Sequence, residues 1–243
     1  MTADLRKLWQ EAFGDSDQAL DAFAATGYSP DRYHCIEENG IPVSALYWFD
    51  CELSGYKLAY IYAVATLKSH RGQGLARRLM TETHEILKEK GYAGAILVPG
   101  KKELFAFYEK LGYRVATKAE DFSAFATDLP VFISEIYPAE YATWRRKYLP
   151  EGGVVQEWET LSYLATYAKF YKGEDFLLSA TKDGETLLVH EILGNTNCCG
   201  NILCALACKA GHFRTPGTGR DFAMYLPLTA DCPQPRYFGL ALD

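Results

Sequence analysis

A glycine-rich turn is the part of this sequence whose residue types and spacing point most directly to chemistry. The turn spans residues 71–76, which read RGQGLA, and Arg77 follows it. A helix that begins inside such a turn offers unpaired N–H groups and the positive end of its dipole. Gly72 and Gly74 carry no Cβ, so a phosphate can approach the main chain, while Arg71 and Arg77 add positive charge. The turn is therefore predicted to bind a diphosphate.

The segments on either side of this turn favour a strand and a helix. Residues 58–66 are β-branched and aromatic, which is typical of a buried strand. Apolar residues between Leu75 and Leu87 recur at helical spacing until Gly91. Two common phosphate motifs are excluded, because Arg77 occupies the last position of G-x-G-x-x-G and the turn contains no Gly-Lys-Ser/Thr.

The pattern Arg-x-x-Gly-x-Ala at residues 71–76 resembles the coenzyme A turn of the GNAT-type N-acyltransferases. Residues 104–114, which read LFAFYEKLGYR, resemble the next motif of that family, a helix that leads to a glycine turn and a strand. Both segments have the family's order and separation, and the resemblance covers roughly residues 32–115. It implies an α/β fold with a mixed sheet, acetyl-CoA as cosubstrate without a metal, and direct acetyl transfer to a primary amine of a small molecule or peptide.

The resemblance also implies roles for individual residues. Main-chain groups of Val64, Ala65 and Thr66 would pair with the pantetheine arm, and one of their N–H groups would polarise the thioester carbonyl. Tyr108 matches the family's general acid, since a phenol stays protonated at neutral pH and can hydrogen-bond the departing sulfur. From its spacing alone, Tyr108 is also explained as an aromatic residue on the apolar face of a helix. The residues that would hold the diphosphate are Arg71, Gly72, Gln73, Gly74, Leu75, Ala76 and Arg77.

The general base is the participant that the resemblance leaves unassigned. Many relatives carry a glutamate on the motif strand at the position that Tyr60 occupies here. Glu37, Asp50 and Glu52 lie near the expected acceptor side, where each is also explained as a solvated surface carboxylate. In the enhanced-intracellular-survival type acetyltransferases, which also carry tandem folds, the terminal carboxylate reaches the active site, and this chain ends at Asp243. Those relatives have a third domain, so this chain resembles a short tandem-domain relative.

Aromatic residues on neighbouring predicted strands could line the acceptor pocket and contact an ammonium group through cation–π interactions. Side chains alternate along a strand, so about half of these residues can share one face, and packing in the core explains the others. The residues concerned are Tyr47, Trp48, Phe49, Tyr60 and Tyr62.

The order of predicted elements indicates two domains in the 243 residues. Residues 1–126 are predicted to form a GNAT-type, acetyl-CoA-binding catalytic domain, and residues 127–243 a degenerate GNAT-like domain with the same plan. The turn at residues 194–200 corresponds to the coenzyme turn but lacks its pattern, so no second coenzyme site is expected. Elements expected after the coenzyme motifs are a polar crossing segment at 117–128, helices at 138–148, 156–171 and 196–209, a hairpin at 176–193, and strands at 131–136, 211–215, 222–228 and 236–242.

Composition and charge narrow the class of protein. The net charge of −6 argues against a nucleic-acid-binding face and suits a cationic amine substrate. The sequence shows no apolar leader and no run of about 18 apolar residues, so a cytoplasmic protein without a membrane segment is expected. The seven cysteines are predicted to be reduced core residues. Cys204, Cys208 and His212 could bind zinc, but no C-x-x-C pair accompanies them, and no metal site is expected.

The sequence is compatible with three functions. The first is the N-acetyltransferase described above, with oligomerisation left open. The second is a coenzyme A-binding sensor or scaffold without turnover, which Tyr60 at the glutamate position favours. The third is an aminoacyl transferase that uses charged tRNA, which the acidic composition and the intact coenzyme turn disfavour. No motif identifies the acceptor amine.

Overall fold

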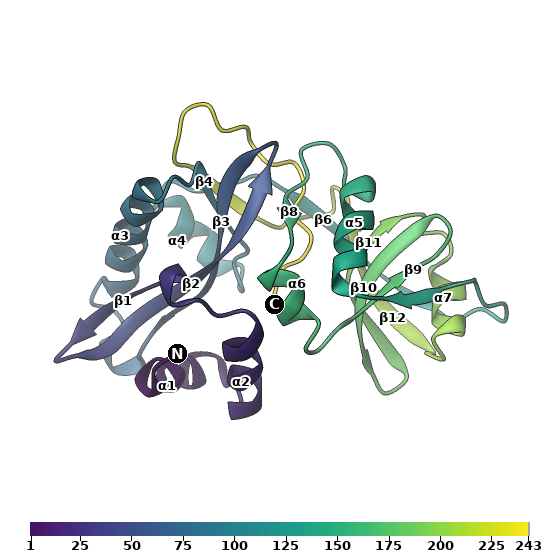
Figure 1. Ribbon diagram of the computed structural model, residues 1–243, viewed down its shortest axis with the longest axis horizontal. Coiled ribbons are helices and arrows are strands. Elements are labelled where there is room, and N and C mark those ends of the chain that lie inside the picture. Colours follow the sequence, from purple (N-terminus) through teal and green to yellow (C-terminus); the bar gives the residue numbers. More distant parts are fainter. Residues whose placement is uncertain (243) are drawn as a thin grey trace. The chain divides into compact units, whose positions relative to one another are not determined.

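The chain is divided between two compact units, each built around a mixed sheet. The computed structural model describes residues 1–242, and Figure 1 shows their helices and strands. Unit 1 consists of Met1–Arg114 together with Met224–Gln234, and unit 2 consists of Val115–Ala223 together with the residues that follow Gln234. The α/β class with mixed sheets that the sequence predicts is confirmed.

Unit 1 contains the predicted strand–turn–helix segment in the middle of its sheet. Its elements are α1 (Ala3–Phe13), α2 (Asp17–Thr26), η1 (Pro30–Arg32), β1 (Tyr33–Glu38), β2 (Ile41–Leu53), β3 (Tyr56–Thr66), η2 (Lys68–His70), α3 (Leu75–Glu89), β4 (Gly94–Leu97), α4 (Glu103–Glu109), β14 (Met224–Pro227) and, at its boundary, β5 (Arg114–Val115). The strand order is β1-β2-β3-β4-β14, antiparallel except between β3 and β4. Parallel pairing requires a crossover, which α3 supplies.

The first elements of unit 1 begin and end where local sequence chemistry predicts. The side chains of Thr2 and Ser16 cap α1 and α2, because each accepts a hydrogen bond from a main-chain N–H group of the first turn. Asn39 and Gly40 join β1 to β2 with φ angles of 52° and 77°, as a tight hairpin requires. Local sequence signals therefore determine these two helices and this hairpin.

Unit 2 repeats the plan of unit 1 with different side chains. Its elements are β6 (Lys118–Phe125), β7 (Ser134–Ile136), α5 (Pro138–Tyr148), β8 (Val155–Gln156), α6 (Glu159–Leu164), β9 (Lys169–Lys172), β10 (Phe176–Asp183), β11 (Thr186–Gly194), α7 (Cys199–Ala205), β12 (Ala210–Pro216) and β13 (Arg220–Asp221). The strand order is β13-β6-β12-β11-β10-β9-β7. Here β10 and β11 form the predicted hairpin, and α7 connects the parallel pair β11 and β12. The core of this unit lies between α7 and the sheet.

In each unit the strand beyond the parallel pair comes from across the predicted domain boundary at residue 126. In unit 1, β14 pairs antiparallel with β4, and the ring of Tyr225 covers Gly94 so closely that no side chain fits there. In unit 2, β6 pairs antiparallel with β12 from Ala119 to Phe125. Figure 1 shows the exchange by colour, because the late, yellow strand β14 lies beside the early strand β4. The two units therefore differ from the predicted division after residue 126.

Several elements predicted for the second half of the sequence are wrong. Residues 117–128, expected to be a crossing segment, contain β6, which forms despite its polar sequence because β12 and β13 pair with it. Residues 156–171, expected to be one helix, contain β8, the short α6 and β9. The backbone of Trp158 has φ of 58° and ψ of −115°, a combination that no helix contains. The helix α7 is also shorter than predicted.

The C-terminal segment is not the strand that the sequence predicts at residues 236–242. It has no regular strand structure among the described residues and makes one isolated bridge, between Tyr237 and Gly153. The residues from Tyr237 to Leu242 are nevertheless buried, and the side chains of Phe238 and Leu240 are fully so. The segment is therefore held by specific side-chain and main-chain contacts rather than by the hydrogen bonds of a paired strand.

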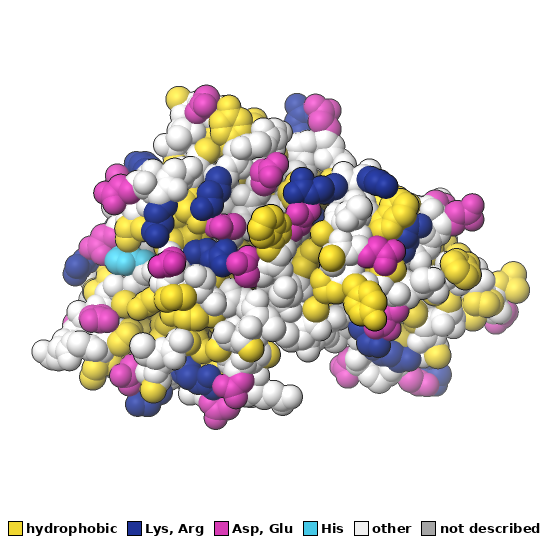
Figure 2. Space-filling model, in the orientation of Figure 1, with side chains coloured by type: hydrophobic (Ala, Val, Ile, Leu, Met, Phe, Trp, Pro, Cys, Tyr) yellow, Lys and Arg dark blue, Asp and Glu magenta, His cyan; other side chains and the backbone are white. Residues whose placement is uncertain are grey.

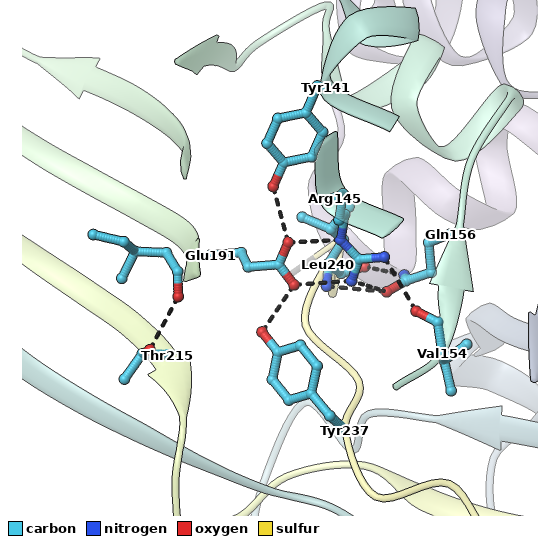
Figure 3. Close-up of polar contacts among 9 residues, drawn as sticks. Tyr141, Arg145, Val154, Gln156, Glu191, Thr215, Tyr237 and Leu240 are labelled. Atoms are coloured by element: carbon cyan, nitrogen blue, oxygen red, sulfur yellow. Dashed lines mark hydrogen bonds and ion pairs between the residues drawn. The ribbon is translucent and has the colours of Figure 1, made fainter. Parts of the chain in front are cut away.

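A buried polar cluster in unit 2 supplies these contacts (Figure 3). Glu191 on β11 forms a two-pronged ion pair with Arg145 on α5, with N–O distances of 2.7 and 2.9 Å. The hydroxyls of Tyr141 and Tyr237 donate to the same carboxylate at 2.9 and 2.8 Å. All four side chains are buried, so each charge depends on these partners instead of water.

The cluster also fixes the main chain near the C-terminus. The side chain of Gln156 donates to the carbonyl of Leu240 at 2.6 Å and accepts from its N–H at 3.1 Å. Gly239 passes so close to Glu191 that a Cβ would collide with the carboxylate. The last described residues are thereby tied to β8 and β11 of the same unit.

Candidate functional site

The strand β3 separates from β4 just before the residues expected to bind the pantetheine arm. It pairs with β4 only through Leu58–Tyr60, and Ala63 has φ of 52°, which bulges the strand. The indole N–H of Trp9 on α1 donates to the carbonyl of Ala63 at 3.1 Å and holds the bulge. Among the described residues, the β4 side of residues 64–66 thus lies outside strand pairing, and its main-chain groups can pair with an extended ligand.

The other side of this segment is held firmly by β2. Ala65 lies opposite Ala45, and Thr66 opposite Ser44. The buried hydroxyl of Ser44 donates to the carbonyl of Ala65 at 3.0 Å and lies 2.8 Å from the hydroxyl of Thr66. Sequence reasoning missed Ser44, because a single serine in an apolar strand belongs to no motif. Val64, between the bulge and Ala65, is half-buried.

The turn after β3 has the geometry of an anion cradle. Gly72 and Gly74 have φ angles of 79° and 78°, in the left-handed region that favours glycine. Apart from the glycine and its chain neighbours, no described residue has an atom within 4 Å of a Cβ position at either glycine, so the space beside the turn is open. Gly74 is the N-cap of α3, and no side chain caps this helix, so its first N–H groups are available to a ligand.

The remaining residues of the predicted diphosphate site surround this turn. The Nε atom of Arg71 donates to the carbonyl of Thr66 at 3.1 Å, which ties the turn to the end of β3. The side chains of Arg71, Gln73 and Arg77 are exposed, and residues 75–76 are half-buried. The residues expected to bind pantetheine and diphosphate are therefore placed on consecutive elements of one unit.

Tyr108 lies near the end of α4 with a buried ring. The side chain is 7% exposed, and burial raises the pKa of its phenol to about 12. Among the described residues no group hydrogen-bonds the hydroxyl, which is therefore free to bond a ligand atom. At neutral pH the phenol is protonated and can donate a hydrogen bond or a proton. The ring serves the apolar packing as well, so the two interpretations of Tyr108 are compatible.

None of the candidate bases stands out in this geometry. Tyr60 is buried among aromatic rings of the core. Asp50 forms ion pairs with Arg32 at 3.3 Å and with Lys57 at 3.7 Å. Glu37 is exposed and Glu52 is half-buried. Asp243 lies outside the described residues. The base therefore stays unassigned.

Most of the aromatic residues considered for the acceptor pocket belong to the core. The hydroxyl of Tyr47, for example, donates to the carbonyl of Gly27 at 2.7 Å, inside unit 1. Only Tyr62 of this set is partly exposed. The buried members are Tyr47, Trp48, Phe49 and Tyr60.

The rest of the described surface offers few other sites. Among residues 1–242, no group of three or more His, Cys, Asp or Glu side chains is arranged to hold a metal ion. His212, considered as a zinc ligand, bonds the hydroxyl of Ser123 at 2.9 Å, and all seven cysteines are free thiols. No described helix has the length and apolar character needed to span a membrane. On the face drawn in Figure 2, Lys and Arg side chains are interspersed with Asp and Glu.

Comparison with known proteins identifies relatives of this arrangement. Residues 2–116 match the family model of the acetyltransferase (GNAT) domain, whereas a search of curated proteins finds no match. A GCN5-related N-acetyltransferase from Kribbella flavida superposes with a TM-score of 0.69 and 17% identity, over 91% of this chain and 67% of that one. Eis1 from Mycobacterium abscessus superposes with a TM-score of 0.64 and 14% identity, over 93% of this chain and 71% of that one. A tandem GNAT protein from the clavulanic acid biosynthesis pathway superposes with a TM-score of 0.55 and 10% identity, over 94% of this chain and 96% of that one.

Residues 2–116 accordingly match an acetyltransferase domain of the GNAT family, whose members are acyltransferases that bind a coenzyme A donor and an acceptor. Beyond that domain the likeness is one of fold, because the chain superposes on Eis1 and on the tandem GNAT protein over more than nine tenths of its length. The resemblance and the tandem fold that the sequence predicts are both confirmed.

Proposed function

We propose that this protein is an acetyl-CoA-dependent N-acetyltransferase that moves the acetyl group directly to a primary amine of a small molecule or peptide. One observation carries the proposal: the open main-chain edge of residues 64–66 runs into the uncapped, glycine-lined start of α3. Acetyl-CoA has a matching shape, with an extended pantetheine arm that ends at a diphosphate. The net charge of −6 suits a cationic acceptor, and the odd number of cysteines suits the reducing cytoplasm.

In this mechanism the chain contributes positioning, an oxyanion donor and an acid. Main-chain groups of residues 64–66 hold the pantetheine arm, and one N–H polarises the thioester carbonyl. The lone pair of the unprotonated amine attacks the carbonyl carbon, so that a C–N bond forms and the C–S bond breaks. The proton that the nitrogen then loses passes to water, and a proton from water restores the Tyr108 phenol after the step. Tyr108 gives its phenol proton to the departing sulfur, because its raised pKa keeps it protonated until that step.

Replacing Tyr108 by phenylalanine tests the reaction. Turnover is expected to fall at least about thirtyfold, the loss of a general acid, with unchanged acetyl-CoA affinity. The measurement is chromatographic detection of free coenzyme A with pooled polyamines, aminoglycosides, amino acids and peptides as acceptors. Tight binding of acetyl-CoA without release in any pool would favour the sensor that Tyr60 suggests. Undiminished turnover in Tyr108→Phe would remove the tyrosine from the mechanism.

Replacing Gly74 by alanine tests the cofactor turn. The new Cβ occupies the open space beside the helix start, and the dissociation constant of acetyl-CoA is expected to rise at least about tenfold. Gly40→Ala is the matched control, because Gly40 has a φ of 77° in the hairpin turn and is equally open. Both variants carry similar backbone strain, so only the first should lose affinity by calorimetric titration. Equal affinity in both would contradict a diphosphate at this turn.

A further inference from the structure

A histidine and a tyrosine join the cofactor-binding helix to the helix that carries Tyr108. His84 lies on the buried face of α3, and its Nε2 atom is 3.0 Å from the hydroxyl of Tyr113. Tyr113 follows Gly112, whose φ of 93° turns the chain after α4. The side chain of His84 is 7% exposed and that of Tyr113 is fully buried. The bond therefore forms away from water, between two elements that are distant in sequence.

Both partners are neutral under ordinary conditions. Burial, with a smaller contribution from the nearby Lys88, lowers the pKa of His84 to about 4. Burial also raises the pKa of the Tyr113 phenol well above its ordinary value. A neutral imidazole has one nitrogen that accepts, so the hydroxyl of Tyr113 can donate to Nε2 when Nδ1 carries the proton. Loss of either partner would change this geometry without leaving a buried charge.

Tyr113 in turn packs against Tyr108. Their ring centroids are 5.8 Å apart and the planes meet at 68°, an edge-to-face contact. The N–H of Tyr113 also donates to the carbonyl of Tyr108 at 3.2 Å. Since no described group hydrogen-bonds the Tyr108 hydroxyl, the orientation of that phenol is set by ring packing.

From these contacts we infer that His84 is a positioning residue, which acts through Tyr113 to hold Tyr108 at a fixed place relative to α3. The inference rests on the proposed function, because it assigns the acid to Tyr108. The contacts from His84 to Tyr113 and from Tyr113 to Tyr108 link two parts of the proposed site. One is the helix that begins at the diphosphate turn, and the other is the phenol that must reach the sulfur of the same cofactor. A small displacement of that phenol slows proton transfer while the turn still binds the cofactor.

Substitutions at both ends of the bond test this inference in the full-length protein. Tyr113→Phe and His84→Leu are each expected to lower kcat about tenfold, with the dissociation constant of acetyl-CoA within about twofold of the unchanged protein. His84→Gln is expected to restore most of the turnover, because the glutamine amide can occupy the place of Nε2. His34→Leu is the control, since His34 contacts Glu82 of α3 at 3.0 Å on the half-exposed side of the helix.

A double-mutant cycle separates positioning from general support of the fold. In a Tyr108→Phe background, His84→Leu should cause no further loss of turnover, because the group that it positions is already gone. An equal loss in both backgrounds would overturn the inference and leave the proposed function intact. Undiminished turnover in Tyr108→Phe alone would instead overturn the acid, and the positioning role with it. Tyr113→Phe removes only one hydroxyl and is expected to fold. Its kcat therefore tests the inference even if His84→Leu does not fold.

Discussion

Replacing Arg145 by methionine is expected to destabilise the protein by about 3–5 kcal/mol. The reason lies in Glu191, whose carboxylate is fully buried and has the Arg145 guanidinium as its only cationic partner among the described residues, in contact with both oxygens. Methionine fills similar space but leaves that charge with two phenol donors and no cation. Urea denaturation at neutral pH would measure the loss as a lower midpoint.

The adjacent residue provides the control for this prediction. Arg146 makes an equally close pair with Glu157, at 2.6 and 2.9 Å, but its side chain is 49% exposed. The Glu157 side chain is 13% exposed, but the loss of the half-exposed Arg146 side chain opens it to water, and the indole N–H of Trp158 still donates to it at 3.2 Å. Arg146→Met should therefore cost clearly less than Arg145→Met. Similar losses in the two variants would contradict the view that the buried cluster holds the C-terminal segment.

The coenzyme turn could be predicted because its determinants are local. Gly72 and Gly74 are needed for backbone angles that other residues rarely adopt, and the helix after them follows from periodic apolar residues. The same holds for the hairpin at Asn39 and Gly40. In each case, a few neighbouring residues determine the conformation.

The elements that sequence reasoning missed depend on partners far away in the chain. Residues 118–125 are polar enough to suggest a crossing segment, and they form β6 only because β12 and β13 flank them. The buried Arg145 and Glu191 are ordinary charged residues until the fold brings α5 to β11. No local pattern distinguishes such residues from solvated ones.

The same limit applies to the candidate site. Tyr108 could be proposed because a family motif contains it, whereas Ser44, His84 and Tyr113 support the site through contacts between separate elements. The packing role of Tyr60 likewise follows from the rings around it. Supporting residues of this kind emerge only from three-dimensional contacts.

A fragment of residues 1–126 is expected not to fold as a cooperative domain. It lacks β14, so β4 becomes an unpaired edge and the carbonyl of Ala93 loses two main-chain donors, the N–H groups of Leu228 and Thr229. The fragment also ends in β6, whose partners β12 and β13 are absent. Thermal unfolding followed by circular dichroism should show no sharp transition.

A grafted fragment is the matched control, with residues 1–114 joined to residues 224–234 by a short glycine–serine linker. The sheet order places β5, which begins at Arg114, next to β14, so the linker connects neighbouring strands. This fragment restores the pairing of β4 and should unfold cooperatively. Cooperative unfolding of residues 1–126 would show instead that the domain needs no exchanged strand. Because the family match ends at residue 116, the pair of fragments decides whether residues 224–234 complete the acetyltransferase domain.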